Sequence, residues 1–129
     1  MKSKSDLHKR LHGIITKKNR GDYFMSSTES VIKLVKAFIS ELESLGIKLD
    51  KAILFGSYAK NQQKEYSDID VALVSDRFSG FGFEDRQLFS KINIKKEYID
   101  IEPKTFSTAY FDQSDPFIEE IKRTGIVIQ

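Results

Sequence analysis

The chain has no cysteine and no tryptophan, and it has only two prolines. The absence of cysteine excludes disulfides, thiolate zinc sites and a cysteine nucleophile, and it agrees with a reducing compartment. No apolar run approaches the ~18 residues of a membrane-spanning helix, and the basic N-terminal stretch leads into no long apolar segment of the secretory type. We therefore expect a cytoplasmic protein without a membrane partner.

The composition is typical of a globular protein. Of the 129 residues (14.9 kDa), 40% are hydrophobic and 31% are charged, which is neither the pattern of a disordered chain nor that of a fibrous one. This length buries the core of one domain, but it is short for a catalytic domain together with a full substrate domain. Whatever the protein acts on is expected to supply much of the contact surface itself.

Basic side chains are concentrated at the N-terminus. Residues 1–22 carry seven Lys and Arg against two Asp, a net charge of +5, so the total of +2 leaves −3 for the remainder. We therefore divide the chain into a basic appendage over residues 1–22 and one domain over residues 23–129. Such an appendage can contact phosphates or an acidic partner, although a solvated basic helix is the commoner case.

Helical and strand patterns alternate along the domain. A helix is predicted over residues 26–45, where Ser26 and Glu29 have the spacing of a capping box and Gly46 closes the apolar stripe. A second helix opens at Asp115-Pro116 and runs to Gly125, and a short one is predicted over 84–92. Strands are predicted over 52–55, 69–75, 98–102 and 126–128. The order indicates the α/β (α+β) class, a small mixed β-sheet with flanking helices.

Two short motifs stand at the ends of the first two predicted strands. Gly56-Ser57 follows the strand over 52–55, where a glycine, a hydroxyl and the first amides of a following helix would hold phosphate oxygens, with Lys60 adding a positive charge. Asp68 and Asp70 open the next strand on one face, about 7 Å apart. Either motif alone is common by chance, but both at this spacing with apolar flanks are expected about 0.001 times in such a chain. The combination is therefore specific.

A third carboxylate is expected from the strand over 98–102. Asp100 and Glu102 share one face of that strand, and we expect Asp100 to be the functional one because two isoleucines flank it. Three carboxylates would form an all-oxygen ligand set, which suits Mg²⁺ or Mn²⁺ rather than zinc. A metal site beside a phosphate site is what a nucleoside triphosphate requires.

Residues 53–60 (ILFGSYAK) and 66–74 (YSDIDVALV) closely resemble the nucleotidyltransferase motif of the DNA polymerase β superfamily. The chain is most similar to the minimal nucleotidyltransferases, small prokaryotic proteins that are often paired with a helical HEPN protein in toxin–antitoxin modules. The resemblance runs from about residue 27 to residue 129, and it includes the ending over 117–128 (FIEEIKRTGIVI). It does not cover residues 1–22.

The resemblance implies a role for each matching residue. Asp68, Asp70 and Asp100 would hold two Mg²⁺ ions and carry the catalysis, and Gly56 and Ser57 would bind the triphosphate of ATP or another nucleoside triphosphate. The family commonly has a glycine where this chain has Asn61. Because asparagine tolerates the left-handed backbone conformation, we expect the turn to be kept.

The implied reaction is transfer of a nucleoside monophosphate, AMP in the first instance, to a hydroxyl of a partner protein, commonly a tyrosine. Two alternatives remain open at this point. One is a catalytically inactive protein of the same fold that acts as an antitoxin by binding its partner. The other is a nucleic-acid-binding module that uses the basic residues 1–22, for which binding would depend steeply on salt and would not need Mg²⁺.

Overall fold

The computed structural model describes residues 27–65, 67–113 and 115–129. The helices and strands follow in the order α3 (Thr28–Ser44), β1 (Lys51–Phe55), β2 (Ile69–Val74), α4 (Gly82–Gln87), α5 (Ser90–Asn93), the 3₁₀ helix η1 (Lys96–Tyr98), β3 (Ile101–Phe106), α6 (Thr108–Phe111), α7 (Pro116–Thr124) and β4 (Ile126–Val127). No helix in the described part of the chain is long and apolar enough to cross a membrane. The appendage predicted over residues 1–22 lies outside the described residues, so that division stays a prediction.

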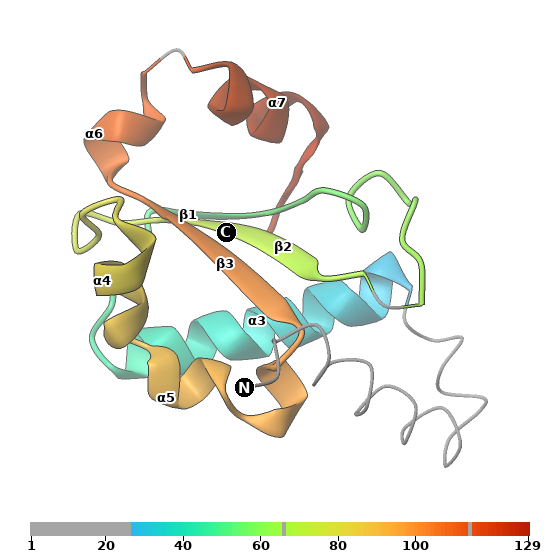
Figure 1. The fold of residues 1–129 in the computed structure, drawn as a ribbon, viewed down its shortest axis with the longest axis horizontal. Coiled ribbons are helices and arrows are strands. Elements are labelled where there is room, and N and C mark those ends of the chain that lie inside the picture. Colours follow the sequence, from blue (N-terminus) through green and yellow to red (C-terminus); the bar gives the residue numbers. More distant parts are fainter. Residues whose placement is uncertain (1–26, 66, 114) are drawn as a thin grey trace.

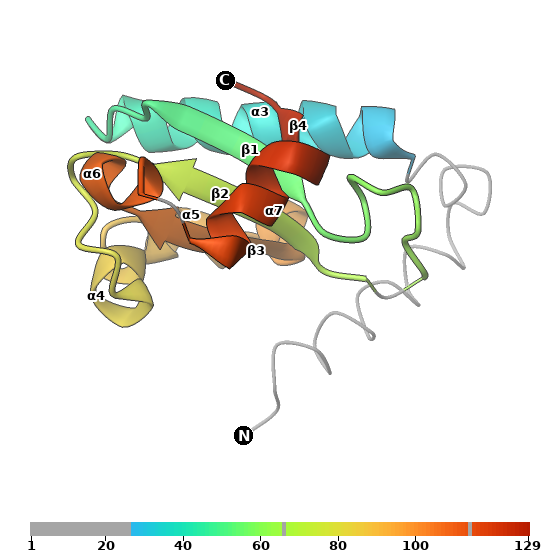
Figure 2. The same ribbon diagram turned by 90° about the horizontal axis from the view of Figure 1, so that it is seen from above.

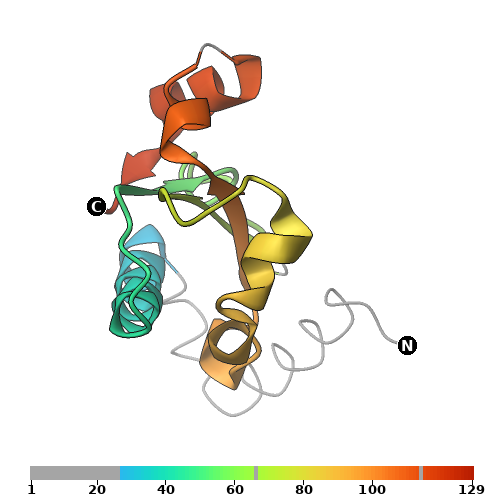
Figure 3. The ribbon, with the colours of Figure 1, turned by 90° about the vertical axis from the view of Figure 1, so that its left-hand side faces the viewer.

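The four strands form one mixed sheet in the order β3-β2-β1-β4. β1 is antiparallel to both β2 and β4, whereas β2 and β3 are parallel. Figures 1 and 3 show α3 and α5 on one side of the sheet and α6 and α7 on the other. The predicted class, an α/β fold with a small mixed sheet and flanking helices, is confirmed.

Both faces of the sheet are apolar, and each face has its own core. Ile69, Val71 and Leu73 of β2 pack with α3, α5 and η1, whereas Ala72 and Val74 pack with α6 and α7. This two-sided burial explains why β1 and β2 contain consecutive apolar residues instead of a strict alternation. Figure 2 shows α7 lying across β1 and β2. Asp68 and Asp70 have the same parity as Ala72, so they belong to the α7 side of the sheet.

Helix α3 follows its predicted apolar stripe, but its cap is one residue later than predicted. The Ser27 hydroxyl accepts a hydrogen bond from the Ser30 amide (3.4 Å), which makes Ser27 the N-cap. Ser26, the predicted cap, lies outside the described residues. Five apolar side chains of the stripe are buried, while Leu45 is 53% exposed because the helix has ended. Gly46 follows with φ +87°, the left-handed conformation that commonly closes a helix.

Three other elements differ from the predictions. The third strand begins at Ile101, because Tyr98 belongs to η1, and it continues through Pro103 to Phe106. Proline is tolerated there because β3 is an edge strand of the described sheet, with β2 as its neighbour on one side. The helix predicted over 84–92 is divided into α4 and α5. Helix α6 was not predicted; it is one turn long and capped by the Ser107 hydroxyl.

A buried carboxylate fixes the loop between β2 and α4. Asp85 is 3% exposed and accepts hydrogen bonds from the Ser79 amide (2.8 Å), the Ser79 hydroxyl (3.0 Å), the Gly80 amide (2.9 Å) and the Thr105 hydroxyl (2.7 Å). Burial raises the pKa of Asp85, but the hydrogen bonds from Thr105, Ser79 and Gly80 outweigh burial and hold the pKa below its usual value. This carboxylate therefore joins the loop to β3.

Replacement of Asp85 by alanine is expected to lower the free energy of unfolding by about 2–4 kcal/mol at pH 7, because four donors lose their buried acceptor. Urea denaturation followed by circular dichroism measures the change. Replacement of the exposed Asp112 by alanine is the control, and it should change the free energy of unfolding by less than about 0.5 kcal/mol. Equal effects of the two substitutions would contradict a structural role for the Asp85 hydrogen bonds.

Candidate active site

A tight turn over residues 56–61 follows β1. Gly56 and Asn61 both have positive φ (+73° and +55°), and the turn is closed by hydrogen bonds from the Lys60 amide to the Gly56 carbonyl (3.2 Å) and from the Gln62 amide to the Ser57 carbonyl (2.8 Å). Asn61 adopts the left-handed conformation expected of it, so the turn is kept without the family glycine. The helix that was predicted to follow Gly56-Ser57 is absent from the described residues, because the chain turns away at Asn61.

The amino end of α3 lies beside this turn. The Thr28 hydroxyl donates a hydrogen bond to the Tyr58 carbonyl (3.0 Å), and Figure 1 shows the start of α3 next to the loop that follows β1. The amino end of a helix carries a partial positive charge that favours anions. The helix end beside the turn is thus that of α3, which precedes the turn in the sequence, and not that of a helix after Ser57.

Gly56 is in direct contact with Asp70. A Cβ atom on Gly56 would lie 2.4 Å from Oδ2 of Asp70, which is closer than atoms approach without displacement. The contact follows from the register of the sheet, because Phe55 of β1 is paired with Asp70 of β2. Only glycine satisfies both the positive φ and the space beside the carboxylate. The structure thus brings the two sequence motifs together.

Asp70 carries the strongly perturbed carboxylate of this region. Burial raises its pKa to about 6, with further increases from the negative charges of Asp68 and Glu102 and a decrease from Lys104. The side chain is only half-buried, so solvent moderates these interactions. Asp68 is exposed at the start of β2. Two carboxylates that repel each other beside a turn of backbone amides form a site that a cation stabilises.

The two candidates for the third carboxylate, Asp100 and Glu102, differ in their position relative to β3. Asp100 precedes β3, and the chain there lies beside β2 through a hydrogen bond from the Ile69 amide to the Asp100 carbonyl (2.9 Å). Glu102, however, is the residue paired with Asp70 in the parallel register. The negative charge of Glu102 also raises the Asp70 pKa. The strand starts three residues later than predicted, so Asp100 precedes β3 and Glu102 lies within it; the role of Asp100 as the third carboxylate stays a prediction.

No three His, Cys, Asp or Glu side chains in the described ranges lie close enough together to enclose a metal ion. The expected convergence of Asp68, Asp70 and Asp100 on one point is thus not seen. The oxygen-only chemistry of Asp68 and Asp70, and the raised pKa of Asp70, nevertheless fit a hard cation such as Mg²⁺. The metal-binding and catalytic roles of Asp68, Asp70 and Asp100 stay predictions.

Lys60 lies in the turn, as predicted, but its ammonium group has a partner on α7. Its Nζ is 3.2 Å from Oε1 of Glu120, and the Arg123 guanidinium is 3.9 Å from the same oxygen. The Lys60 side chain is 37% exposed. A phosphate that approached Lys60 would therefore compete with the Glu120 carboxylate, a contact between distant segments that the sequence did not indicate.

The comparisons with known proteins identify the family. The protein-family model described as "Nucleotidyltransferase domain" matches residues 32–128 of the chain. The chain belongs to this family. The matched range contains the Gly56 turn, Asp68, Asp70 and the whole of the sheet, so the nucleotidyltransferase domain coincides with the described fold.

Three relatives of the nucleotidyltransferase come from Methanocaldococcus jannaschii, and each bears the name "putative protein adenylyltransferase". Two are 29% identical to the chain, and each match covers 70% of this chain. The first match extends over 98 residues and 98% of the relative, and the second over 91 residues and 88% of the relative. The third is 44% identical over 45 residues, which cover 34% of this chain and 45% of the relative. The nucleotidyltransferase is thus similar over most of its length to two proteins that bear the name "putative protein adenylyltransferase".

The fold of the nucleotidyltransferase also has a counterpart among solved structures. A crystal structure described as "a putative nucleotidyltransferase" from Sulfolobus solfataricus matches with a TM-score of 0.58 and 18% sequence identity, over 81% of this chain and 85% of that one. This likeness confirms the nucleotidyltransferase fold predicted from the Gly-Ser and Asp-x-Asp motifs. It carries no conclusion about substrate or partner.

Replacement of Gly56 by alanine is expected to destabilise the fold and to move Asp70, because the new methyl group meets Oδ2 at 2.4 Å and the positive φ is unfavourable. We expect a loss of about 1–3 kcal/mol in the free energy of unfolding, measured by urea denaturation. Gly80 has a positive φ (+91°) with open space around it, so Gly80→Ala is the matched control, with the backbone strain but without the clash. Equal losses in both variants would show that contact with Asp70 adds nothing.

Replacement of Asp70 by asparagine is expected to stabilise the metal-free protein at pH 8. The folded pKa of about 6 lies above the unfolded 3.8, so the folded state binds more protons between these values and stability falls as the pH rises through them. The gain should be about 1–2 kcal/mol at pH 8 after allowance for solvent, and it should vanish below about pH 3.8.

Urea denaturation at pH 3.5 and pH 8 tests this expectation, with Asp76→Asn, an exposed aspartate just after β2, as the control. Addition of 10 mM Mg²⁺ at pH 8 should stabilise the wild-type protein and not the Asp70→Asn variant. If the free energy of unfolding of Asp70→Asn differed from that of the wild type by the same amount at both pH values, the charge of Asp70 would not be the cause.

Proposed function

We propose that this nucleotidyltransferase transfers AMP from ATP to a hydroxyl group of a partner protein, with Mg²⁺ as the cofactor. The observation that carries the proposal is the contact of the Asp70 carboxylate with the Gly56 turn, next to Asp68. It places two carboxylates, which a cation would stabilise, against a backbone turn of the kind that holds phosphates. Membership of the nucleotidyltransferase family gives this arrangement its reaction class.

On the triphosphate side, the turn over residues 56–61 supplies backbone amides and the Ser57 hydroxyl. The amino end of α3, held to the turn through Thr28 and Tyr58, adds a favourable potential for anions. Lys60 exchanges its Glu120 partner for phosphate oxygens when the nucleotide binds, because both groups are exposed enough to separate. These groups orient the pyrophosphate that leaves.

Asp68 and Asp70 are the residues that would hold Mg²⁺. When bound, the ion neutralises charge on the phosphates and lowers the pKa of the accepting hydroxyl. In the reaction, the acceptor oxygen forms a bond to the α-phosphorus, the bond from that phosphorus to the bridging oxygen breaks, and pyrophosphate leaves. The hydroxyl proton passes to a carboxylate at the β3 side of the site: Asp100 by the family motif, or Glu102 by the register with Asp70.

The proposal of a protein acceptor is supported by the relatives, because the names of the three archaeal proteins specify protein adenylyltransferases. The helical HEPN partner and the antitoxin role expected from the family resemblance belong to this proposal. A catalytically inactive binding protein and a nucleic-acid-binding module remain as outcomes of the experiment rather than as second proposals.

Replacement of Asp68 or Asp70 by alanine is expected to reduce the transfer of label from [α-³²P]ATP to protein by at least about 10³-fold, because the metal ligands are lost. The assay uses the full-length protein, Mg²⁺, and the product of the adjacent gene or, in parallel, a soluble cell extract as the acceptor pool. Circular dichroism should show that both variants remain folded, and Asp76→Ala serves as the active control.

Label from [γ-³²P]ATP should not be transferred, because the γ-phosphate leaves with pyrophosphate. Undiminished transfer by either aspartate variant would overturn the assignment, and binding of a partner without any labelling would favour the inactive antitoxin. In the same assay, Asp100→Asn and Glu102→Gln show which carboxylate on the β3 side accepts the proton, by the larger loss and the changed pH profile.

A further inference from the structure

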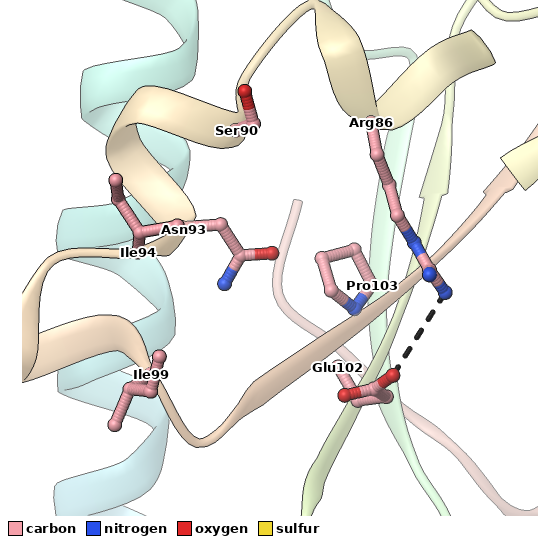
Figure 4. A pocket seen from close by; sticks show the side chains of 7 residues that line it. All are labelled: Arg86, Ser90, Asn93, Ile94, Ile99, Glu102 and Pro103. Atoms are coloured by element: carbon pink, nitrogen blue, oxygen red, sulfur yellow. Dashed lines mark ion pairs between the residues drawn. The ribbon is translucent and has the colours of Figure 1, made fainter. Parts of the chain in front are cut away.

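A small pocket lies at the free edge of β3, next to the candidate active site. Its volume is about 220 Å³, and it lies between the helical segment α4–α5 and the edge strand. The residues that line it include Arg86, Asn93, Ile94, Ile99, Glu102 and Pro103, all of which are drawn in Figure 4. Glu102 belongs both to this pocket and to the charges around Asp70, so the pocket and the active site share a wall.

We propose that this pocket binds a bulky apolar side chain of the acceptor polypeptide and so positions the neighbouring hydroxyl for attack. The inference rests on the proposed function. In an in-line displacement, the attacking oxygen and the leaving oxygen lie on opposite sides of the phosphorus. The leaving pyrophosphate is assigned to the turn after β1, and β2 with Asp70 lies between β1 and β3. The acceptor therefore approaches from the β3 side, where the pocket is.

The charge of the lining favours a neutral occupant. The guanidinium of Arg86 lies 3.8 Å from Oε1 of Glu102 (dashed line in Figure 4), so the cation and the anion in the lining face each other. A phosphate or a charged side chain would have to separate this pair. The other walls are formed largely by the side chains of Ile94, Ile99 and Pro103. The pocket therefore suits an aliphatic or aromatic side chain.

The size of the pocket favours a single side chain over a nucleoside. A volume of about 220 Å³ is below the range of roughly 300–1,000 Å³ that is usual for small-molecule sites. Ile94 is 70% exposed, so one wall stands open at the surface, as a peptide that enters from outside requires. The pocket is thus large enough for a residue of the size of leucine or phenylalanine.

Asn93 prevents an added strand from occupying this edge. Its Nδ2 donates hydrogen bonds to the carbonyls of Tyr98 (3.1 Å) and Ile101 (3.2 Å), which covers the edge at Ile101, and Pro103 has no amide hydrogen to offer. A peptide therefore cannot extend the sheet along this stretch. The amide oxygen of Asn93 points into the pocket on the side of Pro103 (Figure 4) and can accept one hydrogen bond from the backbone of the occupant.

The first test is a titration of the ¹⁵N-labelled full-length protein with N-acetyl-phenylalaninamide, followed by NMR. We expect shifts of the Asn93 side-chain amide and of the backbone amides of Ile94 and Ile99, and at least 10-fold weaker binding to the Ile94→Asp variant. The matched control is Phe83→Asp, since Phe83 is 78% exposed on α4 and does not line the pocket. Absence of shifts over residues 86–103, or shifts of the Asn93 side chain with adenosine, would overturn the proposal.

The second test measures AMP transfer from [α-³²P]ATP to the acceptor pool. The Ile94→Asp variant should lose at least 10-fold in transfer while its Kd for MgATP changes less than 2-fold, and Phe83→Asp should match the wild type. A Kd for MgATP that rises as much as transfer falls would assign the pocket to the nucleoside and overturn the proposal. If the wild type transfers no AMP, the proposed function fails, and the NMR titration alone decides whether the pocket binds an apolar side chain.

Discussion

The contact between the Gly56 backbone and the Asp70 carboxylate is the constraint on which the rest of the site depends. It exists because Phe55 is paired with Asp70, so the end of β1 and the start of β2 lie side by side. A shift of one residue in that register would turn both aspartates toward the α3 side of the sheet and exchange the two cores. The apolar side chains of β1 and β2, which are buried on both faces, thus fix the position of the acidic pair as firmly as they fix the fold.

This arrangement destabilises the charged form of Asp70 at a place where a bound ligand can stabilise it. Asp70 is half-buried, the negative charges of Asp68 and Glu102 raise its pKa further, and the positive charge of Lys104 does not outweigh these effects. Elsewhere, the buried Asp85 has a full set of donors, which is the usual treatment of a structural carboxylate. These two aspartates differ: the charge of Asp70 is destabilised by burial and by neighbouring carboxylates, whereas the hydrogen bonds of Asp85 stabilise its charge and serve the fold. Functional sites commonly contain groups that lower the stability of the folded protein.

The sequence predicted the elements that carry local signals and failed where distant contacts decide. The Asp115 cap and the following proline gave α7 its correct start, and the Gly56 and Asp-x-Asp motifs were placed correctly at the end of β1 and at the start of β2. The start of β3 was predicted too early because residues 99–102 alternate apolar and acidic side chains as a strand does, whereas Tyr98 belongs to η1. The pairing of β3 with β2, which places Glu102 opposite Asp70, is not readable from that alternation. Likewise, the Lys60–Glu120 pair joins segments far apart in the chain, for which no single stretch of residues provides a signal.

The pairing of β4 with β1 has a consequence for the order in which the sheet can form. β4 pairs with the middle of β1, Ile126 with Leu54 and Val127 with Ile53, so the paired segments are far apart in the sequence. β1 leads directly into the Gly56 turn, and the strand that supports the turn therefore has one neighbour, β2, from the next strand along the chain and another, β4, from a distant segment. Pairings between distant segments form slowly, since loop closure must precede them. We therefore expect β1 to pair with β2 before β4 joins, so that the support of the turn is complete only after the slower of the two pairings.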